Sequence, residues 1–146
     1  MDPEGATSTF AGQVKGIVGR SLSRRGFTFD RAITVDEGGR NAAAVFFRNR
    51  DCLIQIYWSQ RAGELNCMIA PPDAAYEHGL YDRSAKWRYL NEFVARPDVP
   101  LEQLTELLEA DKVHFQNQDT WLTWLGTRID DYYDSALAGI KGQKPS

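Results

Sequence analysis

Apolar runs separated by short polar clusters fill the stretch from Asn41 to Ala70, and this pattern predicts three antiparallel β-strands. Two polar clusters interrupt the apolar runs, Arg48 to Asp51 and Gln60 to Gly63, and each has the composition of a tight turn between paired strands. The region therefore predicts two consecutive hairpins that share a middle strand.

The two turns predict registers that agree with each other. In the first hairpin Phe47 is expected to face Cys52, and in the second hairpin Trp58 is expected to face Leu65. Both registers place the same side chains of the middle strand on one face of the sheet, and a slip of one residue would send them to the other face. The predicted core face consists of Ala43, Val45, Phe47, Cys52, Ile54, Ile56, Trp58, Leu65, Cys67 and Ile69.

The opposite face of these strands is also largely apolar. It carries Ala42, Ala44, Phe46, Leu53, Gln55, Tyr57, Asn66 and Met68. A sheet face that is open to water normally carries polar side chains, so this composition does not fit full solvation. Another part of the chain is therefore expected to cover this face in part.

Helical periodicity and one more strand precede these hairpins. Apolar residues recur three and four positions apart from Phe10 to Leu22, with Ser8 or Thr9 as the expected cap and Gly26 as the expected end of the helix. A strand is expected from Phe27 to Val35. The acidic, glycine-containing run that follows it is expected to turn the chain back toward Asn41.

The chain after the sheet predicts further helices. Pro71 and Pro72 end the last strand, and no clear period is visible as far as Ser84. Helical patterning spans Trp87 to Arg96 and resumes after Pro100, which suits the first turn of a helix. A final helix is expected from Asp119 to Ile140. Its predicted core stripe is Leu122, Leu125, Ile129, Tyr133, Ala136 and Ile140.

Together these elements predict one α+β domain. It has a four-stranded antiparallel meander, preceded by one helix and followed by about three helices, over residues 7–140, with flexible tails at residues 1–6 and 141–146. The length of 146 residues, with 42% hydrophobic and 25% charged residues, is typical of a single globular domain.

Trp124 does not fit the predicted stripe of the final helix. At about 100° per residue it points almost opposite to the core residues. A large aromatic side chain in that position either packs beneath a neighbouring helix or lies in an interface with a partner.

The charge of the chain is unevenly distributed. Up to residue 96, 13 Lys and Arg residues oppose 11 Asp and Glu residues, and from residue 97 on 4 oppose 9, so net charges of +2 and −5 give the −3 of the whole chain. Glu102, Glu106 and Glu109 share one face of the predicted Leu-rich helix. This face is either solvated or a surface for a basic protein partner. Overall acidity and the lack of a known binding motif predict no nucleic-acid binding.

Membrane, metal and cofactor sites are not expected. The start of the chain lacks a signal-peptide pattern, and no apolar run approaches the roughly 20 residues that span a bilayer, so a cytoplasmic location is expected. Cys52 and Cys67 are expected as reduced core residues on strand interiors. With His78 and His114, these cysteines do not have the spacing of a zinc site, and no glycine-rich phosphate loop is present in the sequence.

Ionisable and aromatic side chains gather between Pro71 and Arg83. His78 with Asp73 or Asp82 is the grouping suited to acid–base catalysis, because histidine titrates near neutral pH and a carboxylate can orient it. No neighbouring residue is identified as an activated nucleophile, so no catalytic site is expected. The segment is instead expected to contact a protein partner through Tyr76, His78, Tyr81 and Asp82.

An amphipathic helix ends in the run from Leu22 to Phe27, and the middle strands of the meander after it read Val45 to Phe47 and Leu53 to Tyr57. This layout resembles small bacterial toxin-immunity proteins. The resemblance covers residues 10–70 and implies binding and blocking of a cognate toxin. Secretion chaperones share the small size, acidity and helix-flanked sheet. A small enzyme that uses the loop around His78 and a self-associating homodimer are the other hypotheses.

The sequence thus favours a non-catalytic protein-binding domain. The expected contacts are the loop from Pro71 to Ser84, the acidic face of the Leu-rich helix and Trp124.

Overall fold

The computed structural model describes residues 3–93 and 118–141, and it forms an α+β fold around one antiparallel sheet. The strands lie in the order β1-β2-β3-β4-β5, so the predicted class and meander are confirmed. The elements are α1 (Pro3–Ser23), β1 (Thr28–Asp36), β2 (Asn41–Arg48), β3 (Leu53–Ser59), β4 (Glu64–Ala70), η1 (Gly79–Tyr81), β5 (Arg88–Tyr89), η2 (Leu90–Phe93) and α3 (Gln118–Ile140).

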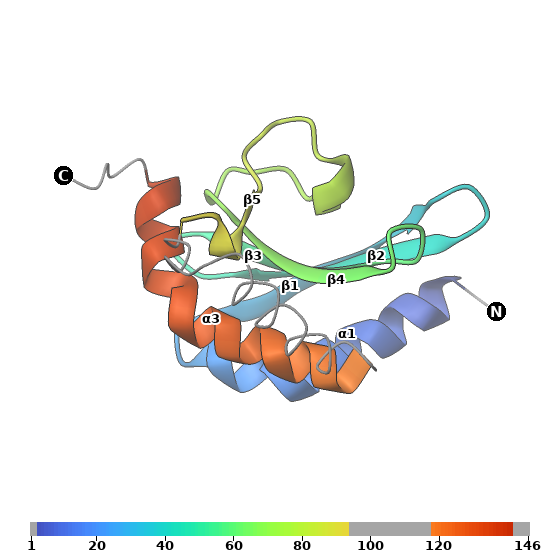
Figure 1. Cartoon of the computed structure of the whole chain (residues 1–146), viewed down its shortest axis with the longest axis horizontal. Coiled ribbons are helices and arrows are strands. Elements are labelled where there is room, and N and C mark those ends of the chain that lie inside the picture. Colours follow the sequence, from blue (N-terminus) through green and yellow to red (C-terminus); the bar gives the residue numbers. More distant parts are fainter. Residues whose placement is uncertain (1–2, 94–117, 142–146) are drawn as a thin grey trace, which may run out of the picture.

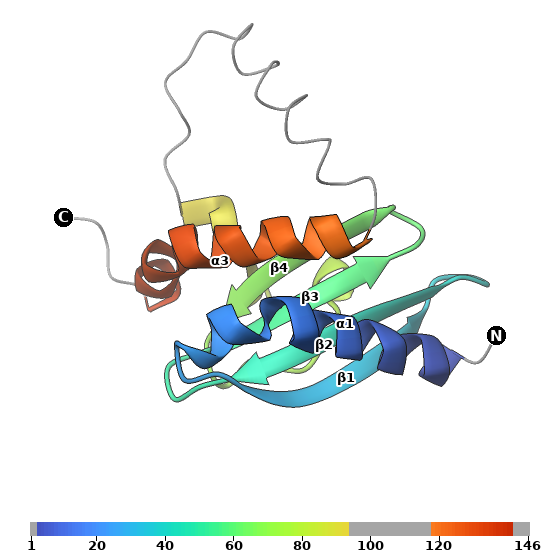
Figure 2. The same cartoon turned by 90° about the horizontal axis from the view of Figure 1, so that it is seen from below.

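The helices α1 and α3 cover one face of the sheet (Figures 1 and 2). The core face predicted from the two hairpins lies beneath them, and all of its residues belong to this main core, with Trp58 partly buried at its margin. The predicted stripe of the final helix also faces the main core, with Ile140 at its edge. These predictions are confirmed.

Helix α1 begins earlier than expected and ends where expected. It starts at Pro3, so neither Ser8 nor Thr9 caps it. At its end, Gly26 has a φ of +78°, and the amides of Gly26 and Phe27 donate to the carbonyls of Ser23 and Leu22 at 3.1 Å each. This hydrogen-bond pair is a Schellman motif, which glycine favours because it adopts positive φ without strain.

The register of the first hairpin differs from the prediction by two residues. Phe47 faces Ile54 rather than Cys52, because the four-residue turn lies at residues 49–52, one position later than predicted, where Asn49 holds it. Its Oδ1 atom accepts hydrogen bonds from the amides of Asp51 and Cys52 at 2.8 and 2.9 Å. Cys52 therefore lies in the turn, although it is still buried. A shift of two residues keeps each side chain on its predicted face, and the predicted register of the second hairpin is correct.

The prediction of a helix from Trp87 to Arg96 is wrong for the residues that the structure describes. Residues 88–93 form β5 and the short 3-10 helix η2 instead. β5 is a fifth strand that the sequence did not predict, and it pairs with β4 at Met68 and Ile69. Trp87 and Leu90 have helical spacing, but they pack on opposite faces of the sheet. The helix predicted after Pro100 lies outside the described residues.

The other face of the sheet is covered, as the sequence predicted, and its buried side chains form a second core. The segment of residues 71–87, called the cover segment below, lies across this face (Figure 1). Gln55 fixes the segment, because its side chain donates to the carbonyl of Glu77 at 3.0 Å and accepts from the amide of Gly79 at 2.9 Å. The second core comprises Ala44, Phe46, Leu53, Tyr57, Met68, Ala70, Ala74 and Trp87.

Candidate functional site

Three segments that are distant in sequence meet at one end of the sheet: the β1–β2 turn, the β3–β4 turn and η1. Local hydrogen bonds shape the first of these turns. Asp36 Oδ1 accepts from the amides of Gly38 and Gly39 at 3.1 Å each, and both glycines have positive φ. The chain reverses directly after β1, which places Glu37 beside the end of β3.

Glu37 is a buried carboxylate at this meeting point, with 8% of its surface exposed. Its Oε2 atom accepts from Ser59 Oγ at 2.7 Å and from the hydroxyl of Tyr81, and its Oε1 atom accepts from the amide of Arg61 at 3.2 Å. Burial raises the pKa of Glu37, but these three donors outweigh burial and lower it below its usual value. Glu37 is therefore a charged hydrogen-bond acceptor that ties the three segments together.

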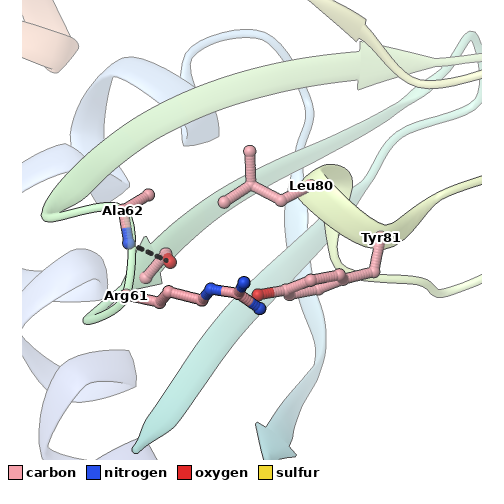
Figure 3. A pocket seen from close by; sticks show the side chains of 5 residues that line it. Arg61, Ala62, Leu80 and Tyr81 are labelled. Atoms are coloured by element: carbon pink, nitrogen blue, oxygen red, sulfur yellow. Dashed lines mark hydrogen bonds between the residues drawn. The ribbon is translucent and has the colours of Figure 1, made fainter. Parts of the chain in front are cut away.

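An open hollow of about 320 Å³ lies beside Glu37 and is lined by Ser59, Arg61, Ala62, Leu80 and Tyr81 (Figure 3). We call it the Tyr81 hollow. The guanidinium of Arg61 lies beside the phenol of Tyr81 in this view. The amide of Ala62 donates to Ser59 Oγ at 3.1 Å, which fixes the turn beneath the hollow. The lining thus combines a cation, an aromatic ring and small apolar groups.

Tyr81 is exposed but held in place. Its exposed fraction is 41%, and Tyr81 and Phe29 are the large hydrophobic residues that are exposed in the described part of the chain. The hydroxyl of Tyr81 donates to Glu37, and its ring lies 5.3 Å from the ring of His78. The hydrogen bond to Glu37 also raises the pKa of Tyr81, so the phenol stays protonated at neutral pH. The sequence predicted Tyr81 as a contact residue but missed its partners.

His78 is buried, with 1% of its surface exposed, so it offers no surface for contact with a partner. Its Nδ1 atom accepts from the amide of Leu80 at 3.3 Å, so the proton of the neutral ring lies on Nε2, which faces the carbonyl of Trp58 at 3.2 Å. Burial lowers the pKa of His78 and favours this neutral form. Its structural role is to position η1.

The acid–base grouping considered for His78 is not formed. Asp73 pairs with Lys86 at 3.0 Å, and Asp82 accepts from the amide and hydroxyl of Ser84 at 3.0 and 2.6 Å. Neither aspartate has a hydrogen bond to His78, so neither orients its ring.

Tyr76 lies away from the Tyr81 hollow and anchors another part of the cover segment. Its hydroxyl donates to Asp30 and accepts from Arg48 at 2.7 Å, and Arg31 lies over its ring at 3.7 Å. The hydrogen bond from Tyr76 is the largest cause of a lowered pKa at Asp30. Tyr76 therefore joins the cover segment to β1 and β2.

Trp124 is half-buried and packs against the main core, with the guanidinium of Arg128 at 4.9 Å from its ring. It therefore contributes to the packing around α3. Glu102, Glu106 and Glu109 lie outside the described residues, so the predicted acidic face stays a prediction.

Nothing in the described part of the chain forms a cluster of three or more metal-ligating side chains. Cys52 and Cys67 are buried free thiols, and burial raises the pKa of both, to about 11 for Cys52. Both thiols therefore stay protonated at neutral pH. Among the described helices, none is long and apolar enough to cross a membrane.

Comparisons with protein-family models, with curated proteins and with solved structures found no match for this chain. The function is therefore inferred from the residues at the end of the sheet.

Proposed function

We propose that this chain is a non-catalytic protein-binding domain that contacts its partner through the Tyr81 hollow. The observation that carries the proposal is the state of Tyr81, which is 41% exposed while its hydroxyl is fixed by the buried Glu37. A tyrosine side chain has few rotatable bonds, and here one rotamer is already selected before binding. Such a preorganised aromatic loses little conformational entropy when a partner covers it.

The neighbour of Tyr81 supports the same role. Arg61 lines the hollow beside it. Tyrosine and arginine are enriched among the few residues that dominate the binding energy of protein interfaces. Leu80 and Ala62 complete a lining of the mixed kind that a protein side chain can fill.

The reactive groups near the hollow are engaged inside the chain, which favours binding over catalysis. The lowered pKa of Glu37 makes it a weak base, and its oxygens already accept from three donors. Ser59 is fully buried, and its hydroxyl donates a hydrogen bond to Glu37. His78 is neutral but buried, and its ring has no hydrogen bond to Ser59.

The more specific proposal is an immunity-type inhibitor of a cognate bacterial toxin. Its support is the resemblance of the end of α1 and of the following meander to such proteins. The rival is a secretion chaperone. Co-expression with a toxin encoded beside this chain distinguishes the two, because an inhibitor restores growth of the producing cells and a chaperone does not.

Affinity capture from the native cells, followed by binding measurements with the recovered partner, tests the proposal. Tyr81→Ala is the test variant, and Phe29→Ala is its matched control, because Phe29 is an aromatic residue of nearly equal exposure, 42%. Loss of an interface anchor costs about 2 kcal/mol or more. The Kd should therefore rise at least tenfold for Tyr81→Ala and stay within twofold for Phe29→Ala.

Two results would contradict the proposal. One is the absence of any protein that binds the purified chain reversibly and with a fixed stoichiometry. The other is equal affinity of the wild type and Tyr81→Ala, with both proteins folded by circular dichroism.

A further inference from the structure

The guanidinium of Arg61 stands at the Tyr81 hollow without a carboxylate partner among the described residues. Two carboxylates lie near it. The oxygens of Glu37 accept from Ser59, Tyr81 and the main-chain amide of Arg61, and Glu64, opposite Ser59 in the sheet, accepts from the side chain of Asn66 at 3.0 Å. None of these hydrogen bonds involves the side chain of Arg61. The fold therefore stabilises the buried negative charge with other donors and leaves the exposed positive charge available.

The remaining lining of the hollow is mostly apolar, because Ser59 is fully buried and its hydroxyl already donates to Glu37. The side chains of Leu80 and Ala62 and the ring of Tyr81 lie around the guanidinium (Figure 3). A ligand that fits must place an anionic group on Arg61 and a short aliphatic portion against these groups. Charge complementarity and a guanidinium's capacity for bidentate hydrogen bonds favour a carboxylate.

The main-chain amides at the hollow distinguish between sources of that carboxylate. The amides of Arg61, Ala62 and Gly63 donate to Glu37, Ser59 and Gln60. Those of η1 are also engaged: Gly79 donates to Gln55, and both Leu80 and Tyr81 donate to His78. Capture of a chain terminus or a phosphate commonly uses a nest of free amides. With these amides engaged, the side chain of Arg61 is the donor that an incoming anion meets.

We propose that the Tyr81 hollow binds a glutamate side chain of an acidic partner protein, with the carboxylate on Arg61 and the methylene groups against Leu80 and Tyr81. The inference rests on the proposed protein-binding function and names the chemistry of the partner's contact. It assigns Arg61 the role of selecting an acidic residue, and Tyr81 and Leu80 the role of covering its aliphatic portion.

Titration of the isotope-labelled full chain by two-dimensional NMR tests this directly. The probe is N-acetyl-glutamate N-methylamide, and its neutral counterpart is N-acetyl-glutamine N-methylamide. The glutamate probe should shift the signals of Arg61, Ala62, Leu80 and Tyr81 saturably, with a Kd at least fivefold below that of the glutamine probe.

Two arginine variants supply the matched pair. Arg61→Gln should raise the Kd of the glutamate probe at least fivefold. Arg50→Gln should leave it within twofold, because Arg50 is an exposed arginine in the β2–β3 turn, at the other end of the β3 strand. Circular dichroism of both variants shows whether each keeps the native fold.

Several outcomes would overturn the inference. These are equal affinity for the two probes, shifts that map to residues outside the hollow, or unchanged affinity in Arg61→Gln. Tighter binding of N-acetyl-alanine with a free carboxylate would assign the hollow to a chain terminus, and tighter binding of inorganic phosphate would assign it to a phosphate. If the partner binds Arg61→Gln as well as the wild type but loses Tyr81→Ala, the glutamate contact fails and the proposed function stands. If no partner exists, the proposed function fails by itself.

Discussion

Gly79 lies where the cover segment approaches the sheet most closely, and a methyl group added there tests how tightly the second core is packed. A Cβ atom built on Gly79 would lie less than 3.0 Å from the sulfur of Met68, 3.4 Å from Tyr57 Cε2 and 3.5 Å from Gln55 Oε1. The contacts with Tyr57 and Gln55 are ordinary, whereas the overlap with Met68 forces a movement. Gly79→Ala therefore perturbs the packing but removes no hydrogen-bond donor or acceptor.

The expected cost follows from the surroundings of Met68. This residue is 4% exposed and packs in the second core, so its sulfur has little free space into which to move. Overpacking of a filled core by one methyl group costs about 1 to 3 kcal/mol. The φ of Gly79 lies outside the left-handed region, so alanine adds no comparable backbone strain, and the cost is steric.

Urea denaturation followed by tryptophan fluorescence and circular dichroism measures this cost. Gly16→Ala in α1 is the matched control, because a Cβ atom there meets nothing within 4 Å. That substitution should raise the free energy of unfolding by about 0.5 to 1 kcal/mol, since alanine is the better helix former. The two Gly→Ala substitutions should thus change the free energy of unfolding in opposite directions.

The double variant with Met68→Ala identifies the clashing group. Met68→Ala alone should cost about 2 to 5 kcal/mol through the cavity that it leaves. In that background Gly79→Ala should cost little or nothing, which gives a coupling of at least about 1 kcal/mol between the two sites. Two results would refute the packing described for the cover segment. One is an equal loss of free energy of unfolding when Gly79→Ala is introduced into the wild type and into Met68→Ala. The other is a Gly79→Ala variant that is as stable as the wild type.

Two further predictions concern pH and the first hairpin. Burial lowers the pKa of His78 in the folded chain. As the pH falls, the unfolded chain therefore protonates this histidine at a higher pH than the folded chain does. The free energy of unfolding should therefore fall as the pH decreases below about 6.5, by at most about 1.4 kcal/mol per pH unit from this group, until the pH reaches the folded-state pKa. Urea denaturation across that pH range should show a flatter slope for His78→Gln, and identical slopes would contradict the neutral buried ring. Asn49→Ala removes the acceptor of the amides of Asp51 and Cys52 and should cost about 1 to 3 kcal/mol in urea denaturation. The same substitution removes the Nδ2 donor to the carbonyl of Arg25 at 2.9 Å and to the hydroxyl of Tyr133 at 3.2 Å, and an unchanged stability would show that the turn does not depend on Asn49.

Patterns within neighbouring strands predicted much of the fold. Side chains alternate in direction along a strand, so assigning the residues of one face also assigns those of the other. Both faces of β2, β3 and β4 were therefore predicted correctly. The register error at Phe47 arose from Asn49, whose side chain holds the turn at residues 49–52, one position later than the polar cluster indicated. The faces survived this error because the shift was two residues rather than one.

The failed helix prediction after the sheet has a tertiary cause. Trp87 and Leu90 are three residues apart, which fits one face of a helix. In the fold, the pairing of β5 with β4 sends Trp87 to the second core and Leu90 to the main core. Periodicity cannot separate these cases over so short a stretch, because the deciding partner is a strand some twenty residues earlier.

The candidate site was predicted only in part for the same reason. Tyr81 was identified from the aromatic and polar composition of its loop, and the turn from Gln60 to Gly63 from its glycine. Their association depends on Glu37, which accepts hydrogen bonds from both segments although it lies far from them in sequence. An acidic residue next to Asp36 in a glycine-containing turn carries no sequence signal for that role.

Amide hydrogen exchange of the purified complex, compared with the free chain, tests the central claim most directly. If the Tyr81 hollow is the contact surface, the partner should slow exchange in residues 60–63 and 79–82, because covered amides open to solvent less often. Slowed exchange confined to the β1 edge or to the helices, with these two segments unchanged, would contradict the account.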